Sequence, residues 1–121
     1  MTFAVWVGVA ALGGVGAVLR FLLDGAVQNR AATDLPLGTL AVNVSGSFVL
    51  GLLTGLGATG WTLLLAGTAF LGSFTTFSTW MFETHRLGED GEVGLAFVNV
   101  GLSLAAGLAA GAAGWVVGAV L

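Results

Sequence analysis

The chain has 121 residues, of which 57% are hydrophobic and 7% are charged, and its mean hydropathy is +1.04. Water-soluble domains usually carry about 25% charged residues, so these few charges cannot cover a water-facing surface and lipid must be the solvent. The formal net charge is −3, with three arginines and no lysine, which excludes a nucleic-acid-binding surface built on clustered basic residues. The absence of cysteine excludes disulfides and thiolate metal sites.

Four apolar segments are long enough to cross a membrane, because a spanning helix needs ~20 apolar residues. The sequence therefore predicts an all-α membrane protein with one transmembrane domain over residues 1–121 and four spans. The spans are expected at about 3–23, 36–57, 61–82 and 93–121. The first has no basic n-region, so we expect it to be a retained helix and not a cleaved signal.

Polar segments separate the predicted spans. A polar stretch covers residues 24–34, and the only proline, Pro36, suits the first turn of the second helix. Residues 57–60 form a glycine-bounded turn, and residues 83–92 are expected to form a charged loop that contains His85. With so little chain outside the spans, no soluble domain is expected.

The glycines are numerous, at 21, and several recur four residues apart. Small residues at this spacing let transmembrane helices approach closely. The pairs are Gly51 with Gly55, Gly107 with Gly111, and Gly114 with Gly118. Helix packing alone explains most of them, but four short helices with small faces make a poor pore, so we expect an oligomer.

The third span carries an unusual run of hydroxyl residues after Gly72, which lies about halfway along it. The run comprises Ser73, Thr75, Thr76, Ser78 and Thr79. Glycine followed by β-branched threonines weakens a helix, and in lipid a broken helix survives only where its freed carbonyls find partners or line a polar cavity. We therefore predict a break at the middle of this span and an ion or polar pathway beside it. The alternative is a kinked helix whose hydroxyls bond to their own backbone.

Two further helices place polar side chains on one face. Asn43 lies inside the second span with Ser47 one turn later, and Asn99 and Ser103 are likewise four apart in the last span. These two stripes could line one path. Hydrogen bonding between helices is the alternative explanation.

No carboxylate lies inside a predicted span, and Glu83 stands at the end of the third. Proton-coupled transport normally uses an intramembrane carboxylate or histidine relay. The sequence also shows no nucleophile–base pair and no metal-ligand cluster. We therefore expect neither an enzyme nor an organic cofactor.

Three blocks of sequence, in order and at compatible spacing, resemble the signature blocks of the Fluc (CrcB) fluoride channels. They are Gly13–Arg20, Pro36–Phe48 and Gly72–Thr79. The resemblance implies a fluoride-selective channel that exports fluoride passively, with two pores at the interface of an antiparallel, dual-topology dimer in the cell membrane. Its partners would be fluoride, the lipid bilayer, and a second copy of the chain or a paralogous subunit.

The resemblance also implies roles for individual residues. Asn43 would be the pore amide, and Phe77 the first of two pore aromatics, the second of which is Trp80 where the family has phenylalanine. Replacing Trp80 by phenylalanine restores the family residue and is accordingly expected to be tolerated or to improve fluoride flux. Ser78 and Thr79 would belong to a polar track, with Ser47 and Ser103 as further pore residues.

Three more expectations come from the resemblance. Arg20 would lie in a vestibule, and Glu83 would be the acidic residue one turn beyond the aromatic positions. The backbone carbonyls of Gly72 and Thr75 would hold a structural sodium ion on the dimer axis. Fluoride is small and strongly hydrated, so hydroxyl and amide donors and positive aromatic edges suit it, while a pore without buried charge can still release the ion.

Two other functions stay open. A small multidrug-type antiporter would need a carboxylate in its first span, and residues 3–23 contain none. A non-transporting membrane scaffold would not require the polar run of the third span. Arg30 and Arg86 would lie on the side opposite both termini. Lys and Arg in short loops orient membrane proteins, so these two residues give a weak bias toward a single orientation. A dimer with a paralogous partner therefore remains the alternative to a homodimer.

Overall fold

The computed structural model describes all residues, 1–121, and is built of helices only. The long helices are α1 (Phe3–Gln28), α2 (Leu37–Gly55) and α6 (Val93–Val120). Each is long and apolar enough to cross a membrane. These three agree with the first, second and fourth predicted spans to within a few residues, so the chain is a multi-pass membrane protein.

The third predicted span is divided among several elements. A first rod runs through α3 (Gly60–Thr62), the π-helical segment η1 (Leu63–Leu71) and α4 (Gly72–Phe74). Thr75 then takes an extended conformation, with φ −82° and ψ 162°, and α5 (Ser78–Glu89) begins three residues later. The backbone is therefore interrupted beside Thr75.

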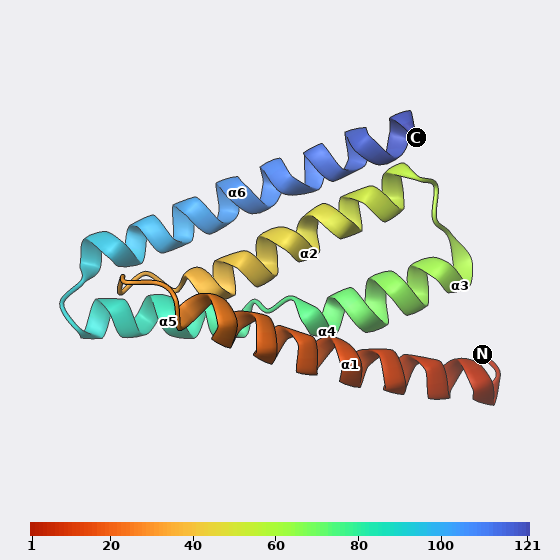
Figure 1. Cartoon of the computed structure of the whole chain (residues 1–121), viewed down its shortest axis with the longest axis horizontal. Coiled ribbons are helices and arrows are strands. Elements are labelled where there is room, and N and C mark those ends of the chain that lie inside the picture. The colour runs from red at the N-terminus through yellow and green to blue at the C-terminus, as the bar shows by residue number, and fades with distance from the viewer.

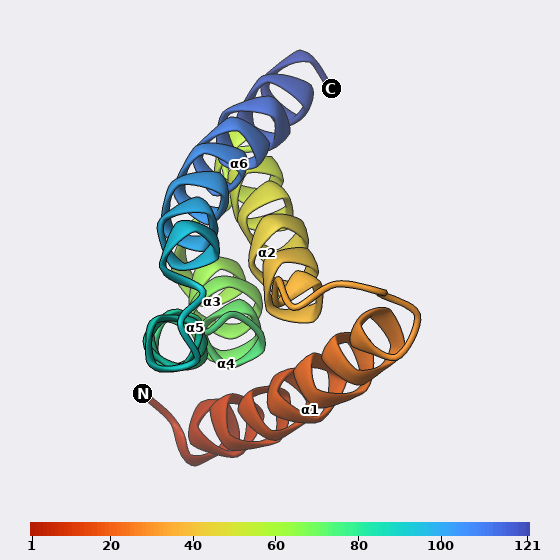
Figure 2. The ribbon, with the colours of Figure 1, turned by 90° about the vertical axis from the view of Figure 1, so that its left-hand side faces the viewer.

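The four rods lie side by side, with both termini and α3 at one end and α5 at the other (Figure 1). Seen from the end where α5 lies, α2 and α6 form a pair and the interrupted rod lies beside them (Figure 2). α1 lies on the side of the interrupted rod that faces away from α6 (Figure 2). α1 packs against η1, α4 and α2, while α5 packs mainly against α6. The ends of α1 and α5 place Arg30 and Arg86 away from the termini.

The expectation of a loop at residues 83–92 is wrong for most of its length, and the polar stretch 24–34 also begins inside a helix. α1 continues through the polar residues Asp24 and Gln28, and residues 83–89, predicted as a charged loop, form the second half of α5. A polar sequence ends the apolar signal without ending the helix. On α5 the exposed pair His85 and Glu89, four residues apart with Nε2 and Oε1 2.7 Å apart, suits a water-facing helix.

The glycines bring α2 and α6 into contact through their backbones. A Cβ atom at Gly51 would overlap the carbonyl oxygen of Gly111, and one at Gly114 would overlap that of Phe48. Gly55 and Gly118 meet the facing backbone in the same way. Because these close-packing faces meet within one chain, they give no argument for an oligomer.

Candidate functional site

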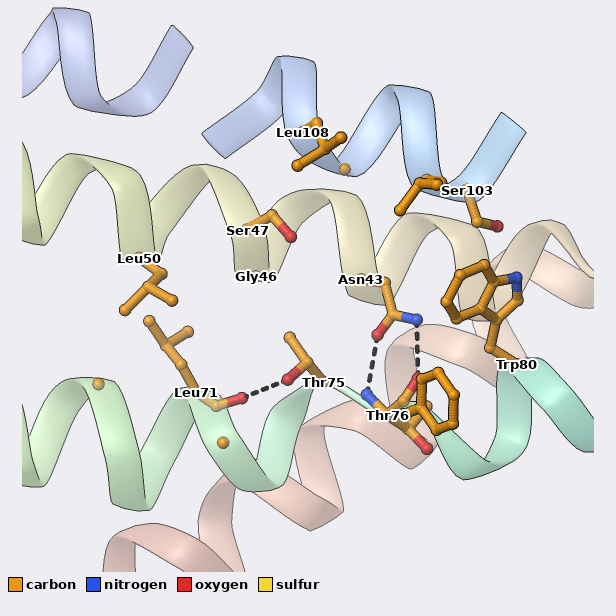
Figure 3. A pocket seen from close by; sticks show the side chains of 15 residues that line it. Asn43, Gly46, Ser47, Leu50, Leu71, Thr75, Thr76, Trp80, Ser103 and Leu108 are labelled. Carbon is orange, nitrogen blue, oxygen red and sulfur yellow. Dashed lines mark hydrogen bonds between the residues drawn. The ribbon is translucent and has the colours of Figure 1, made fainter. Parts of the chain in front are cut away.

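The break in the third rod is bridged by one side chain of α2. The Nδ2 of Asn43 donates to the carbonyl oxygen of Thr76, and its Oδ1 accepts from the backbone N–H of Thr76, both at 2.8 Å (Figure 3). The amide thus pairs with both backbone groups of Thr76, which a helix would have satisfied. Asn43 therefore holds the interruption in place across two elements, and its second amide hydrogen has no partner in the chain.

Pairing at Thr76 leaves two carbonyls without the N–H they would have in a helix. The N–H of Thr76, the helical partner of Gly72, goes to Asn43. The N–H of Thr79, the helical partner of Thr75, donates to the hydroxyl of Thr76 at 3.2 Å. Neither the Gly72 nor the Thr75 carbonyl accepts any other backbone bond. Both oxygens are free to bind a ligand.

A pocket of about 400 Å³ opens beside the break, between α2, the η1–α4 rod and α6. None of its lining residues is ionisable. The polar groups come from Asn43 and Ser47 on α2, Thr75 and Thr76 at the break, and Ser103 on α6 (Figure 3). The structure thus brings Ser103, one of the two predicted polar residues of α6, to the polar side chains of α2 beside the predicted polar run.

Two of these hydroxyls, on α2 and α6, differ from those of Ser45 and Thr54 on α2. Ser45 and Thr54 donate back to carbonyls of α2, at 2.7–3.1 Å. Ser47 and Ser103 have no hydrogen-bond partner in the protein and line the pocket. Hydroxyls within a helix usually bond to the preceding turn, so these two are available as donors to a bound species.

The two predicted pore aromatics also meet at this pocket. The rings of Phe77 and Trp80 touch edge to face, with centroids 5.6 Å apart and an interplanar angle of 87°. Phe77 is 70% exposed at the pocket mouth. An aromatic edge carries positive charge density, so this corner offers a weakly positive surface without a formal charge.

The remaining predicted residues gather elsewhere. Thr79 and Arg20 line a second pocket of about 210 Å³, on the other side of Thr76. Ser78 lines neither pocket, and its hydroxyl lies 3.4 Å from that of Thr76. Thr76 lines both pockets and so connects the residues around the main pocket with Thr79 and Arg20.

Sequence reasoning missed Thr76 as a site residue, and it also missed Thr39. Thr39 lies one turn before Asn43, so the spacing of Asn43 and Ser47 could have been extended back to it. Its hydroxyl is buried and donates to the carboxylate of Glu83. Thr39 therefore links α2 to α5, as Asn43 links α2 to the break.

Glu83 lies just past the third predicted span, near the polar end of the molecule. Burial raises the pKa of its carboxyl above the ordinary 4.5, and nearby Asp24 adds to the rise. The Thr39 hydrogen bond and Arg86 act in the opposite direction. Because burial is the largest influence, the neutral acid is favoured relative to an exposed glutamate.

The fold and pocket define a small multi-pass membrane protein whose polar groups surround a break in one rod. Residues 7–115 match the family described as CrcB-like protein, Camphor Resistance (CrcB). The chain belongs to the CrcB family.

Relatives are similar along nearly their whole length. Fluoride-specific ion channel FluC 2 of Mycolicibacterium paratuberculosis is 58% identical over 109 residues, which cover 90% of this chain and 89% of that protein. The FluC 2 protein of Mycobacterium bovis is 50% identical over 117 residues, covering 96% and 93%. That of Haloarcula marismortui is 51% identical over 100 residues, covering 83% and 82%.

Proposed function

We propose that this chain is a subunit of a fluoride-selective channel, and that fluoride passes through the pocket beside the break. The observation that carries the proposal is the pair of unpartnered hydroxyls, Ser47 and Ser103, in a pocket without ionisable groups. A small anion that gives up water needs donors in exchange, and neutral donors hold it weakly enough to let it leave. Relatives at 50–58% identity named fluoride-specific ion channels support the same conclusion.

Ion flux from liposomes tests this function. Purified protein in vesicles loaded with fluoride should release it when the membrane potential is short-circuited, with no pH gradient and without passing chloride. Equal chloride flux would contradict a selective channel, and no flux at all would favour a scaffold.

The antiporter alternative is tested in the same vesicles. α1 does contain a carboxylate, Asp24, but it lies near the helix end and packs against Gly38, outside the main pocket. An antiporter would need a proton gradient for transport. Strict dependence on such a gradient, lost in Asp24→Asn, would replace the channel with that mechanism.

The functional unit that we propose is an antiparallel dimer in the cell membrane, formed by two copies or with a paralogous subunit. The pocket is open at Phe77, so one chain encloses only part of a path. The end that carries Arg30 and Arg86 has only these two basic side chains more than the other end, or three if Arg20 is counted with them. A bias in Lys and Arg of this size is small enough to permit insertion in both orientations. Tags at the termini should be accessible from both sides when the chain is expressed alone. Tags on one side only, with no flux, would require a second subunit.

A sodium ion on the dimer axis completes this proposal. The support is that the carbonyls of Gly72 and Thr75 lack hydrogen-bond partners, and freed carbonyls in lipid need a partner. Oxygen ligands suit a hard cation, whose charge would hold the two breaks together. The dimer should melt at a higher temperature in sodium than in an equal concentration of N-methylglucamine. Identical melting in both would reject the ion.

A further inference from the structure

Three hydrogen bonds form a closed ring between α5 and α6. The indole Nε1 of Trp80 donates to the backbone carbonyl of Asn99 at 3.2 Å. The side-chain Nδ2 of Asn99 donates to the Thr84 hydroxyl at 2.8 Å, and that hydroxyl donates to the backbone carbonyl of Trp80, also at 2.8 Å. The ring begins and ends at Trp80, so one residue of α6 fixes both the backbone and the side chain of the tryptophan.

Asn99 is suited to this role because it is only 2% exposed. A buried amide in an apolar helix needs partners, and the ring uses both its backbone oxygen and its side-chain donor. The sequence suggested a pore stripe of Asn99 and Ser103. The structure places only Ser103 at the main pocket and directs Asn99 toward α5.

Trp80 is also part of the pocket wall. It lines the pocket and contacts the Phe77 ring edge to face. Phe77 is 70% exposed and has no other aromatic neighbour. The orientation of the Phe77 ring decides whether its positive edge or its negative face meets an anion. The tethered indole is the aromatic group in contact with this ring.

We propose that Trp80 is a positioning residue, whose indole N–H fixes the Phe77 ring and thereby the preference for fluoride over chloride. This inference rests on the proposed function. A phenylalanine at position 80, expected from the resemblance to be tolerated or to improve flux, keeps an aromatic ring but has no donor for the Asn99 carbonyl. The tryptophan N–H, and not its larger size, is the feature that matters.

One experiment separates the N–H from the size of the indole. Replacing Trp80 by 3-benzothienylalanine keeps the bicyclic shape and removes only the donor. Fluoride flux should fall on the order of 5-fold, the factor that one neutral hydrogen bond is worth, and the fluoride-to-chloride ratio should fall with it. Trp80→Phe should do the same, whereas Trp61→Phe, the same change at an exposed site in α3, should have no effect. Wild-type flux and selectivity with benzothienylalanine would overturn the proposal.

A second measurement does not depend on transport. A 4-fluorophenylalanine at position 77 gives a ¹⁹F resonance that reports the ring's surroundings. Thr84→Val keeps the tryptophan but removes the hydroxyl that links the Asn99 side chain to the Trp80 carbonyl, so the indole is held less firmly. This variant should shift or broaden the ¹⁹F line, whereas Thr84→Ser, which keeps the hydroxyl, should leave the line as in the wild type. An unchanged line in Thr84→Val would overturn the positioning role. If the wild-type protein carried no fluoride, the proposed function would fail and this line would still decide the role of Trp80.

Discussion

Replacing Asn43 by alanine tests how the break is held. The substitution removes both bonds to Thr76, each 2.8 Å long. A neutral hydrogen bond contributes about 1 kcal/mol net, so the loss is at least about 2 kcal/mol. Because Thr76 is 9% exposed, its backbone N–H and carbonyl would be left without partners, which raises the expected cost to about 4 kcal/mol.

The assay is denaturation in detergent together with fluoride flux from liposomes. We expect Asn43→Ala to lower the free energy of unfolding by this amount and to reduce flux at least 10-fold. Asn43→Asp has nearly the same shape but places an oxygen against the Thr76 carbonyl, so it should also fail. Thr54→Val is the matched control, because Thr54 bonds only within α2 and lies outside the pocket. Wild-type stability and flux in Asn43→Ala would show that the break does not depend on this amide.

Further outcomes follow from the same contacts. Ser47→Ala should reduce fluoride flux several-fold, whereas Ser45→Ala, whose hydroxyl bonds to its own helix, should conduct normally; equal flux in the two variants would remove Ser47 from the path. Gly51→Leu should separate α2 from α6 and lower the melting temperature in detergent, and unchanged melting would contradict the close packing. Because the folded-state pKa of Glu83 is raised above 4.5, the folded chain binds its proton more tightly than the unfolded chain. Its contribution to stability is therefore full below pH 4.5 and declines as the pH rises through the folded-state value; Glu83→Gln should abolish this decline, measured as melting temperature against pH.

Hydropathy predicted the three long helices well, because burial in lipid leaves a continuous apolar signal. It failed at the water-facing ends, where α1 and α5 continue as helices through polar residues. The polar run of the third span predicted the region of the site, but it did not show which hydrogen-bond donor pairs with which acceptor. Thr76 belongs to the site because its backbone pairs with Asn43 across α2 and the break, and this pairing is visible only in the structure.

Other contacts leave no periodic mark in a sequence. The bond from Trp80 to Asn99 joins residues 19 apart on different helices. It depends on how α5 turns against α6 after the intervening turn, where Gly91 has a φ of 80°. A single sequence shows a tryptophan and a buried asparagine, but the direction of the indole N–H comes only from the packed helices.

The pairing of α2 with α6 also sets an order of assembly during synthesis. α6 is the last helix of this chain to leave the ribosome, so Gly51 and Gly55 have no backbone partner while α3, η1, α4 and α5 are being inserted. Only when the segment from Gly111 to Gly118 enters the membrane can α2 reach its final position. The pocket, which needs walls from both helices, closes at that last step. A nascent chain that stops before α6 therefore lacks one wall of the pocket, so the pocket cannot form before synthesis of the helices is complete.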